Sequence, residues 1–296
     1  MRRRDFVSVL AAGLVPAWRL TPREQFVERW SWAMGQPVHL MLFAGSEQQG
    51  LDACAAGLAE LRRVESRLSL FDDASDLCEL NRRAGRRPMH VDVDLKSVLE
   101  RATAFRRLTE GAFDVAVEPI MRAWDFPEPA STPPTPAELA EAREAVRTAE
   151  VHVEGATARL PNAHTQLDFG GIGVGYGIDR ALGVLRERGI SRAFVDVSGD
   201  CAAIGAPPGE AGWIVDIADP VRTGASIATT VLRDAALATS ANTVRRHVFD
   251  PATGRPANAL RQTSVVASTA IAADALSTAM LVSGRRAPGV ARAYTV

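Results

Sequence analysis

A glycine-rich stretch in the middle of the chain constrains the possible folds more than any other feature. Residues 167–179 read LDFGGIGVGYGID, so an apolar segment that we expect to be a strand ends in a glycine-rich turn that leads into a helix. Because glycine has no side chain, such a turn lets a phosphate approach the main-chain N–H groups at the start of the helix. The same pattern also serves close packing or a tight bend, but the flanking Asp168 and Asp179 favour a binding site.

The spacing of these glycines excludes the two most familiar nucleotide-binding motifs. After Gly171 and Gly173, the position at which G-x-G-x-x-G requires a third glycine holds Tyr176. The stretch also lacks the Gly-Lys-Ser or Gly-Lys-Thr sequence of a P-loop. The sequence therefore predicts a strand–turn–helix unit that is neither a Rossmann fingerprint nor a P-loop.

The order of helical and strand patterns predicts the fold class. Patterns typical of helices cover residues 46–68, 94–109, 176–188 and 271–282, and a further helix starts at Thr135. Short β-type runs cover residues 151–153, 158–160, 167–169, 193–197, 213–217 and 264–267. Because the two kinds of element do not alternate strictly, we expect a mixed α/β (α+β) fold in a single domain over residues 21–296. The proline-rich segment 127–136 is expected to be a surface loop of that domain.

The composition limits the classes of partner. Apolar residues make up 47% of the chain and charged residues 23%, an ordinary mix for a globular protein. The 34 Lys and Arg residues balance the 35 Asp and Glu residues to a net charge of -1, so we expect no nucleic-acid partner. Three cysteines are too few for a disulfide framework or a structural zinc site. No apolar run reaches the roughly 18 residues of a transmembrane helix.

The N-terminus has the form of an export signal. Three arginines at positions 2–4 precede a short apolar stretch, and Arg3-Arg4-x-Phe6 resembles the twin-arginine type. We therefore expect residues 1–20 to be an export signal and the protein to be periplasmic, in solution or associated with the membrane. A frayed basic terminus is the alternative interpretation.

An oxygen-donor pair lies on the apolar helix near the C-terminus. Asp274 and Thr278 are four residues apart, which places them on one face of one helical turn. A carboxylate and a hydroxyl at that spacing suit a hard cation such as Mg²⁺. An acidic residue in the first turn also stabilises the helix dipole, so that structural role is the alternative.

A histidine precedes a strong turn signal in the same half of the chain. His247 comes just before Asp250-Pro251-x-x-Gly254, a sequence typical of a tight turn. Its imidazole could act as a base or as a phosphate contact, and a structural role is the alternative.

Taken together and in order, these segments resemble the ApbE-like flavin transferases, the FAD:protein FMN transferases. The match spans residues 34–284. The resemblance rests on Met34-Gly35, on Glu65, Leu68, Ser69 and Phe71, on Leu80-Asn81, and on residues 111–114 (GAFD), 167–179, 197–200 (VSGD), 219–220, 238–240 (ATS), 247–254 and 273–278.

The resemblance implies a single flavin-binding domain and a Mg²⁺-dependent reaction. FAD is split at its pyrophosphate, FMN passes to a threonine or serine hydroxyl of a target protein, and AMP leaves; typical targets are exported respiratory redox subunits. By this likeness the Asp274 and Thr278 side chains and the Gly171 carbonyl ligate Mg²⁺, and His247 is the candidate base, with Asp274 as its rival. The residues implied to line the FAD site are Met34, Phe71, Ala112, Phe113, Asp114, Asp168, Val174 and His247.

Several positions depart from the family pattern and keep other functions open. Val174 stands where the family often has lysine, Gln36 replaces threonine, Phe71 replaces the flavin-stacking tyrosine, and Ala241 replaces glycine. One alternative is a periplasmic FAD-binding or FAD-hydrolysing homologue that modifies little or no protein. Another is an assembly protein with a vestigial site.

Overall fold

A seven-stranded antiparallel sheet forms the centre of the protein, which we describe from a computed structural model in residues 24–126, 133–243 and 247–296. The predicted export segment 1–20 and much of the proline-rich segment 127–136 lie outside the described residues. The strands in spatial order are β1 (Gln25–Ala33), β2 (Gln36–Ala44), β6 (Ala193–Val197), β7 (Asp200–Ile204), β10 (Ala235–Ala241), β13 (Gln262–Ala267) and β14 (Arg292–Thr295). Every neighbouring pair in this sheet is antiparallel, which confirms the mixed α+β class.

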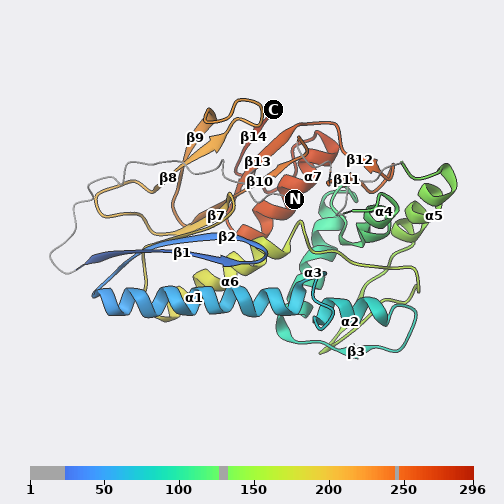
Figure 1. Cartoon of the computed structure of the whole chain (residues 1–296), viewed down its shortest axis with the longest axis horizontal. Coiled ribbons are helices and arrows are strands. Elements are labelled where there is room, and N and C mark those ends of the chain that lie inside the picture. The colour runs from blue at the N-terminus through green and yellow to red at the C-terminus, as the bar shows by residue number, and fades with distance from the viewer. Residues whose placement is uncertain (1–23, 127–132, 244–246) are drawn as a thin grey trace, which may run out of the picture.

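Three long helices pack against one face of the sheet: α1 (Glu47–Leu68), α6 (Gly173–Glu187) and α7 (Ala270–Ser283) (Figure 1). Strand β2 turns Val38, Leu40 and Leu42 toward them, because alternate residues of a strand face the same side. Ile178 of α6 is fully buried in the same core. This layer brings the start of α6 against α7.

The opposite face of the sheet is partly covered by the hairpin of β8 (Trp213–Ala218) and β9 (Ser226–Leu232) (Figure 1). Trp213 of this hairpin packs on two sheet residues, with ring centroids 6.0 Å from Phe43 and 5.6 Å from Phe194. Burial of these large aromatic surfaces stabilises the hairpin on the sheet.

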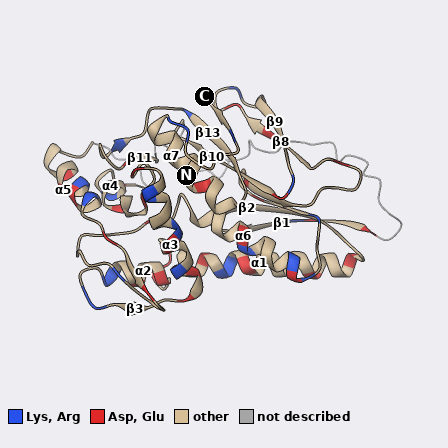
Figure 2. Ribbon diagram, turned by 180° about the vertical axis from the view of Figure 1, so that it is seen from behind, with Lys and Arg blue, Asp and Glu red and all other residues tan. Residues whose placement is uncertain are grey.

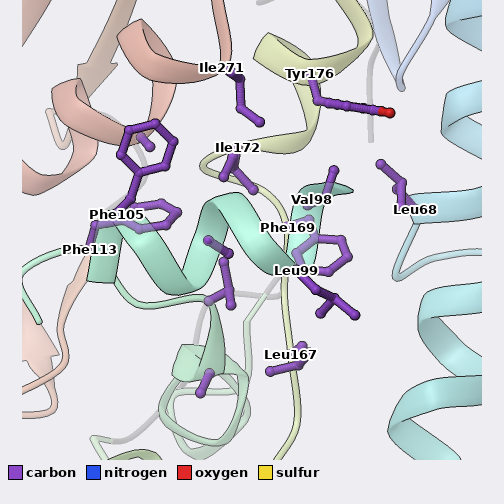
Figure 3. Packing of buried hydrophobic residues seen from close by; sticks show 14 of the residues in the cluster. Leu68, Val98, Leu99, Phe105, Phe113, Leu167, Phe169, Ile172, Tyr176 and Ile271 are labelled. Atoms are coloured by element: carbon purple, nitrogen blue, oxygen red, sulfur yellow. The ribbon is translucent and has the colours of Figure 1, made fainter. Parts of the chain in front are cut away.

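A helical region flanks the sheet and carries much of the remaining core. Its helices are α2 (Asp76–Arg82), α3 (Val93–Leu108), the 3-10 turn η1 (Val115–Val117), α4 (Glu118–Ala123) and α5 (Pro136–Arg147). It also carries two small sheets. The first has three strands in the order β3 (Met89–His90), β5 (Thr157–Arg159) and β4 (His152–Glu154). The second pairs β11 (Phe249–Asp250) with β12 (Arg255–Pro256). Figure 3 shows Phe169 and Ile172 among Val98 and Leu99 of α3.

The surface carries charges of both signs, which Figure 2 shows interspersed along α1 and on α5. Within the described parts of the chain, no helix has the length and apolar character needed to cross a bilayer.

The helices and most strands expected from the sequence are confirmed, with one error in the central motif. Residues 167–169 form no strand. The Asn81 side chain takes the place of a neighbouring strand there: its Oδ1 accepts from Leu167 N–H at 2.8 Å and its Nδ2 donates to Leu167 C=O at 2.9 Å. The Asp168 N–H donates to Val115 C=O of η1 at 2.8 Å, so no ladder forms.

Candidate active site

The glycine-rich turn is held closed by its own backbone and by Asp168. Gly173 N–H donates to Phe169 C=O at 2.7 Å, and α6 begins at Gly173. Asp168 accepts a short hydrogen bond from Gly170 N–H. Burial raises the pKa of Asp168, and the nearby charge of Glu118 adds to that effect, while the Gly170 bond opposes it. The turn therefore presents its backbone next to a carboxyl group.

The first turns of α6 and α7 interlock because Gly175 has no side chain. A Cβ atom at Gly175 would lie only 2.8 Å from Cα of Ile271, which is on α7. The Gly175 N–H donates to Oδ2 of Asp274 at 3.0 Å. In the other direction, Asp179 of α6 accepts from Ala270 N–H at 2.8 Å and Ile271 N–H at 3.0 Å. The two helix starts are thus joined at three backbone groups.

Asp274 is a buried carboxyl group, only 5% exposed, in an acidic environment. Burial raises its pKa well above the usual value; the charges of Asp200 and Asp179 add to this, and the Gly175 bond opposes it. The pKa of Asp200 is itself raised to about 7, chiefly by burial and also by the charge of Asp196. Because like charges disfavour ionisation, a bound cation would stabilise these carboxylates.

The structure brings the predicted metal ligands together. A Cβ atom at Gly171 would lie 3.1 Å from Oγ1 of Thr278, so the turn reaches α7 one helical turn beyond Asp274. The Thr278 hydroxyl is 3.1 Å from Oγ of Ser240 on β10, and Ser240 is 2.7 Å from Oγ of Ser277. Asp274 and Thr278 therefore face the glycine-rich turn from the same side of α7.

The donor chemistry of this cluster fits Mg²⁺. Asp274 and Thr278 offer a carboxylate and a hydroxyl, and the predicted third ligand is the Gly171 carbonyl; all three are oxygen ligands, which Mg²⁺ prefers. Within the described residues, no group of three His, Cys, Asp or Glu side chains is placed to hold a metal ion. A cation here would thus depend on the Thr278 hydroxyl and the Gly171 carbonyl as well as on Asp274.

Two residues predicted to bind FAD, Met34 and Phe113, lie beside glycines of residues 170–177. Met34 lies at the tip of the β1–β2 hairpin, and its Cε would be 3.5 Å from a Cβ atom added at Gly177. Phe113 would contact a Cβ atom at Gly171 through Cε2 at 3.5 Å. Its neighbour Asp114 is ion-paired with Arg106 at 2.8 Å, and burial raises the Asp114 pKa against the effect of that arginine.

Four other predicted residues lie on different elements. Ala112 is half-buried between α3 and η1, and Phe71 is 78% exposed in the loop between α1 and α2. Val174 is half-buried and packs against the core between the sheet and α6. His247 is exposed just before β11, with its ring centroid 6.2 Å from that of Phe126. The roles assigned to these residues stay predictions.

Three further polar residues, Asp200, Ser240 and Asn242, lie near the cluster and carry no role predicted from the sequence. Asp200 follows a Ser-Gly turn, and it accepts from Thr239 N–H at 2.9 Å. Ser240 contacts Thr278, and Asn242 bonds to the backbone beside His247. The Ser-Gly-Asp turn was a usable signal for Asp200, and residues 238–240 were one for Ser240, whereas Asn242 is recognised only through its side-chain bonds to Val248 and Ala257.

Comparison with known proteins places this architecture in a class. The chain superposes on the ApbE protein of Thermotoga maritima with a TM-score of 0.78 at 28% identity, covering 87% of both chains. It superposes equally well on the apo flavinyl transferase ApbE of Pseudomonas stutzeri, with a TM-score of 0.77 at 22% identity, over 88% of this chain and 84% of that one. The fold is that of the flavin transferases.

Sequence relatives give the family. An FAD:protein FMN transferase of Treponema pallidum is 32% identical over 250 residues, which cover 76% of this chain and 69% of that protein. One of Haemophilus influenzae is 30% identical over 246 residues, covering 76% and 71%. The sequence profile of the ApbE family matches residues 34–294. The chain belongs to the ApbE family.

Proposed function

We propose that this protein is an FAD:protein FMN transferase, which moves FMN from FAD to a serine or threonine hydroxyl of a target protein and releases AMP. The observation that carries the proposal is the contact of the glycine-rich turn with Asp274 and Thr278 on α7. The membership of the chain in the ApbE family supports it.

The proposed reaction is a phosphoryl transfer. The acceptor hydroxyl oxygen bonds to the phosphorus of the FMN half of FAD, and the bond from that phosphorus to the AMP phosphate oxygen breaks. AMP leaves with the bonding electron pair, and the hydroxyl proton passes to a base, for which His247 is our candidate and Asp274 its rival. Positioning and charge neutralisation provide most of the catalysis in such reactions.

Within this proposal, Asp274, Thr278 and the Gly171 carbonyl hold Mg²⁺. When bound, the ion would neutralise charge on the phosphate oxygens of FAD. The acidic surroundings of Asp274 and the all-oxygen donor set support the assignment. Met34, Phe71, Ala112, Phe113, Asp114, Asp168, Val174 and His247 are the proposed FAD contacts.

The proposed setting is the periplasm. The twin-arginine pattern at Arg3 and Arg4 supports export of the protein. The proposed acceptor is an exported respiratory redox subunit, on which the flavin is covalently attached.

A flavinylation assay tests the proposal. The protein is mixed with FAD, Mg²⁺ and a redox subunit bearing an acceptor threonine, and the acceptor is followed by intact mass and in-gel fluorescence. We expect a mass gain of one FMN, abolished by EDTA.

Asp274→Ala should lower transfer at least about 100-fold with the fold intact by circular dichroism, because it removes the only carboxylate of the proposed donor set. Full activity in that variant would refute the metal assignment.

The same assay tests hydrolysis of FAD to FMN and AMP as a second candidate function. The observation in its favour is Val174, which packs into the apolar core instead of placing a cation at the turn. AMP release without a mass gain on the acceptor would select hydrolysis.

A further inference from the structure

The side chain of Asn242 joins three backbone groups next to His247. Its Oδ1 accepts from Val248 N–H at 3.1 Å, and its Nδ2 donates to Val248 C=O at 3.0 Å and to Ala257 C=O at 2.9 Å. Asn242 is only 9% exposed. The carboxamide therefore bonds both polar groups of Val248, as an adjacent strand would.

This arrangement links the candidate base to the metal cluster. Asn242 directly follows β10, whose Ser240 contacts Thr278 on α7. The Asn242 N–H also donates to Arg261 C=O at 3.0 Å, which holds the end of β10 in place. Since Val248 is the residue after His247, the Asn242 side chain fixes the backbone that carries the imidazole relative to β10.

The other side of the same segment is anchored separately. Trp124 Nε1 donates to Gly254 C=O at 2.9 Å, and Arg143 Nε donates to Ala252 C=O at 2.9 Å. These bonds attach the β11–β12 turn to α4 and α5, away from β10. These bonds hold the turn without contacting Val248, so removing one of them is a matched control for the loss of the Asn242 side chain.

We infer that Asn242 is a positioning residue, which places the His247 imidazole for the proton transfer from the acceptor hydroxyl. The inference rests on the proposed function, because it gives His247 a role in that reaction. Losing the carboxamide leaves Val248 N–H and Ala257 C=O without this partner, while Val248 C=O keeps its bond from Ala257 N–H at 2.8 Å. The backbone beside His247 then loses its side-chain link to the end of β10 and is free to shift. A displacement of about 1 Å of a catalytic group can reduce a rate by two orders of magnitude.

A double-mutant cycle tests the inference with the full chain. We expect Asn242→Ala to lower kcat for FMN transfer about 10- to 100-fold, with the KM for FAD changed less than about threefold. In a His247→Ala background the same substitution should change kcat less than about twofold, because a residue that acts through His247 has nothing left to position. Arg143→Ala should leave kcat within about threefold of the wild type.

The outcomes separate the inference from the proposed function. A wild-type protein that labels no acceptor refutes both. Normal wild-type transfer with an equal loss from Asn242→Ala in both backgrounds refutes the inference alone, as does full activity of His247→Ala. If Asn242→Ala does not fold, Asn242→Ser takes its place in the cycle, since serine keeps a hydroxyl at the site but is too short to bond Val248 and Ala257 together.

Discussion

One buried carboxylate, Asp94 on α3, holds together the helices around the site. It accepts from the Tyr176 hydroxyl of α6 at 2.7 Å and is ion-paired with Arg63 of α1. Arg180 of α6 lies 3.7 Å away. Burial tends to raise the pKa of Asp94, but the bonds from Arg63 and Tyr176 outweigh it and hold the pKa below the usual value. The charged form of Asp94 therefore stabilises the fold.

Asp94→Asn should destabilise the protein by about 1–3 kcal/mol at pH 7, since it removes the buried charge that pairs with Arg63. Arg63 keeps its pair with Glu60 and is partly exposed, so the cost stays below that of a fully buried pair. The pKa of Asp94 is lower in the folded than in the unfolded protein. The stabilisation from its charge is therefore complete above about pH 4 and is lost as the pH falls through the folded pKa. Urea unfolding of the wild type and of Asp94→Asn at pH 7 and pH 3 measures the change in the free energy of unfolding at each pH.

The matched control for Asp94 is Asp52→Asn on the exposed face of α1, which should change stability by less than about 0.5 kcal/mol. An equal loss from Asp94→Asn at pH 3 and pH 7 would contradict the role of the charge.

At this scale, the sequence predicts as metal ligands a pair of residues that share a local spacing. Asp274 and Thr278 are one helical turn apart, so residue type and spacing predict them, whereas the family resemblance alone implies the Gly171 carbonyl as a third ligand. Ser240 contacts Thr278, 38 residues further along the chain, and Asn242 bonds to Val248 across the intervening loop. A single serine or asparagine near a strand end does not indicate which residues it contacts.

At the scale of elements, the packing of α6 on α7 determines the geometry of the turn. Gly175→Ala should destabilise the protein by at least about 2 kcal/mol, because the new Cβ would meet the backbone of α7, which cannot rotate away as a side chain can. Transfer activity should fall with it, since the Asp274 contact depends on the same approach. Thermal unfolding and the flavinylation assay measure the two effects.

Gly183 provides the control in the same helix. A Cβ atom there meets nothing within 4 Å, so Gly183→Ala should stabilise the protein by about 0.5–1 kcal/mol through helix propensity. Equal effects of the two substitutions would show that the close approach of α6 and α7 does not limit the site.

Sequence patterns predicted the helices better than the strands for identifiable reasons. The helices carry apolar residues at regular spacing over several turns, as α1 and α3 do. The β1–β2 hairpin turns at Met34 (φ 57°) and Gly35 (φ 68°), and methionine replaces the asparagine or aspartate that usually marks such a turn. Residues 167–169 show an apolar run typical of a strand, but the Asn81 side chain satisfies their backbone.

At the scale of the whole molecule, the three cysteines of the sequence all lie in the described part of the chain and form no disulfide there. Cys54, Cys78 and Cys201 are all buried free thiols. Burial raises the pKa of Cys54 to about 11 and raises that of Cys201 as well, which keeps both thiols protonated and unreactive. Because no disulfide is needed, the chain can fold in a reducing cytoplasm, as export of a folded protein through the twin-arginine route demands.

The export proposal therefore predicts a folded cytoplasmic protein when the signal is altered. Replacing Arg3 and Arg4 together by lysine should retain the protein in the cytoplasm with an unchanged melting temperature, because both substitutions lie outside the proposed domain of residues 21–296. Cell fractionation and thermal unfolding of the purified variant measure location and stability. Flavinylation of a co-expressed periplasmic acceptor should fall to background, whereas the purified variant should label the same acceptor at the wild-type rate.

Wild-type periplasmic levels of the lysine variant would contradict the route, and loss of activity in vitro would show that the N-terminus contributes to the site itself.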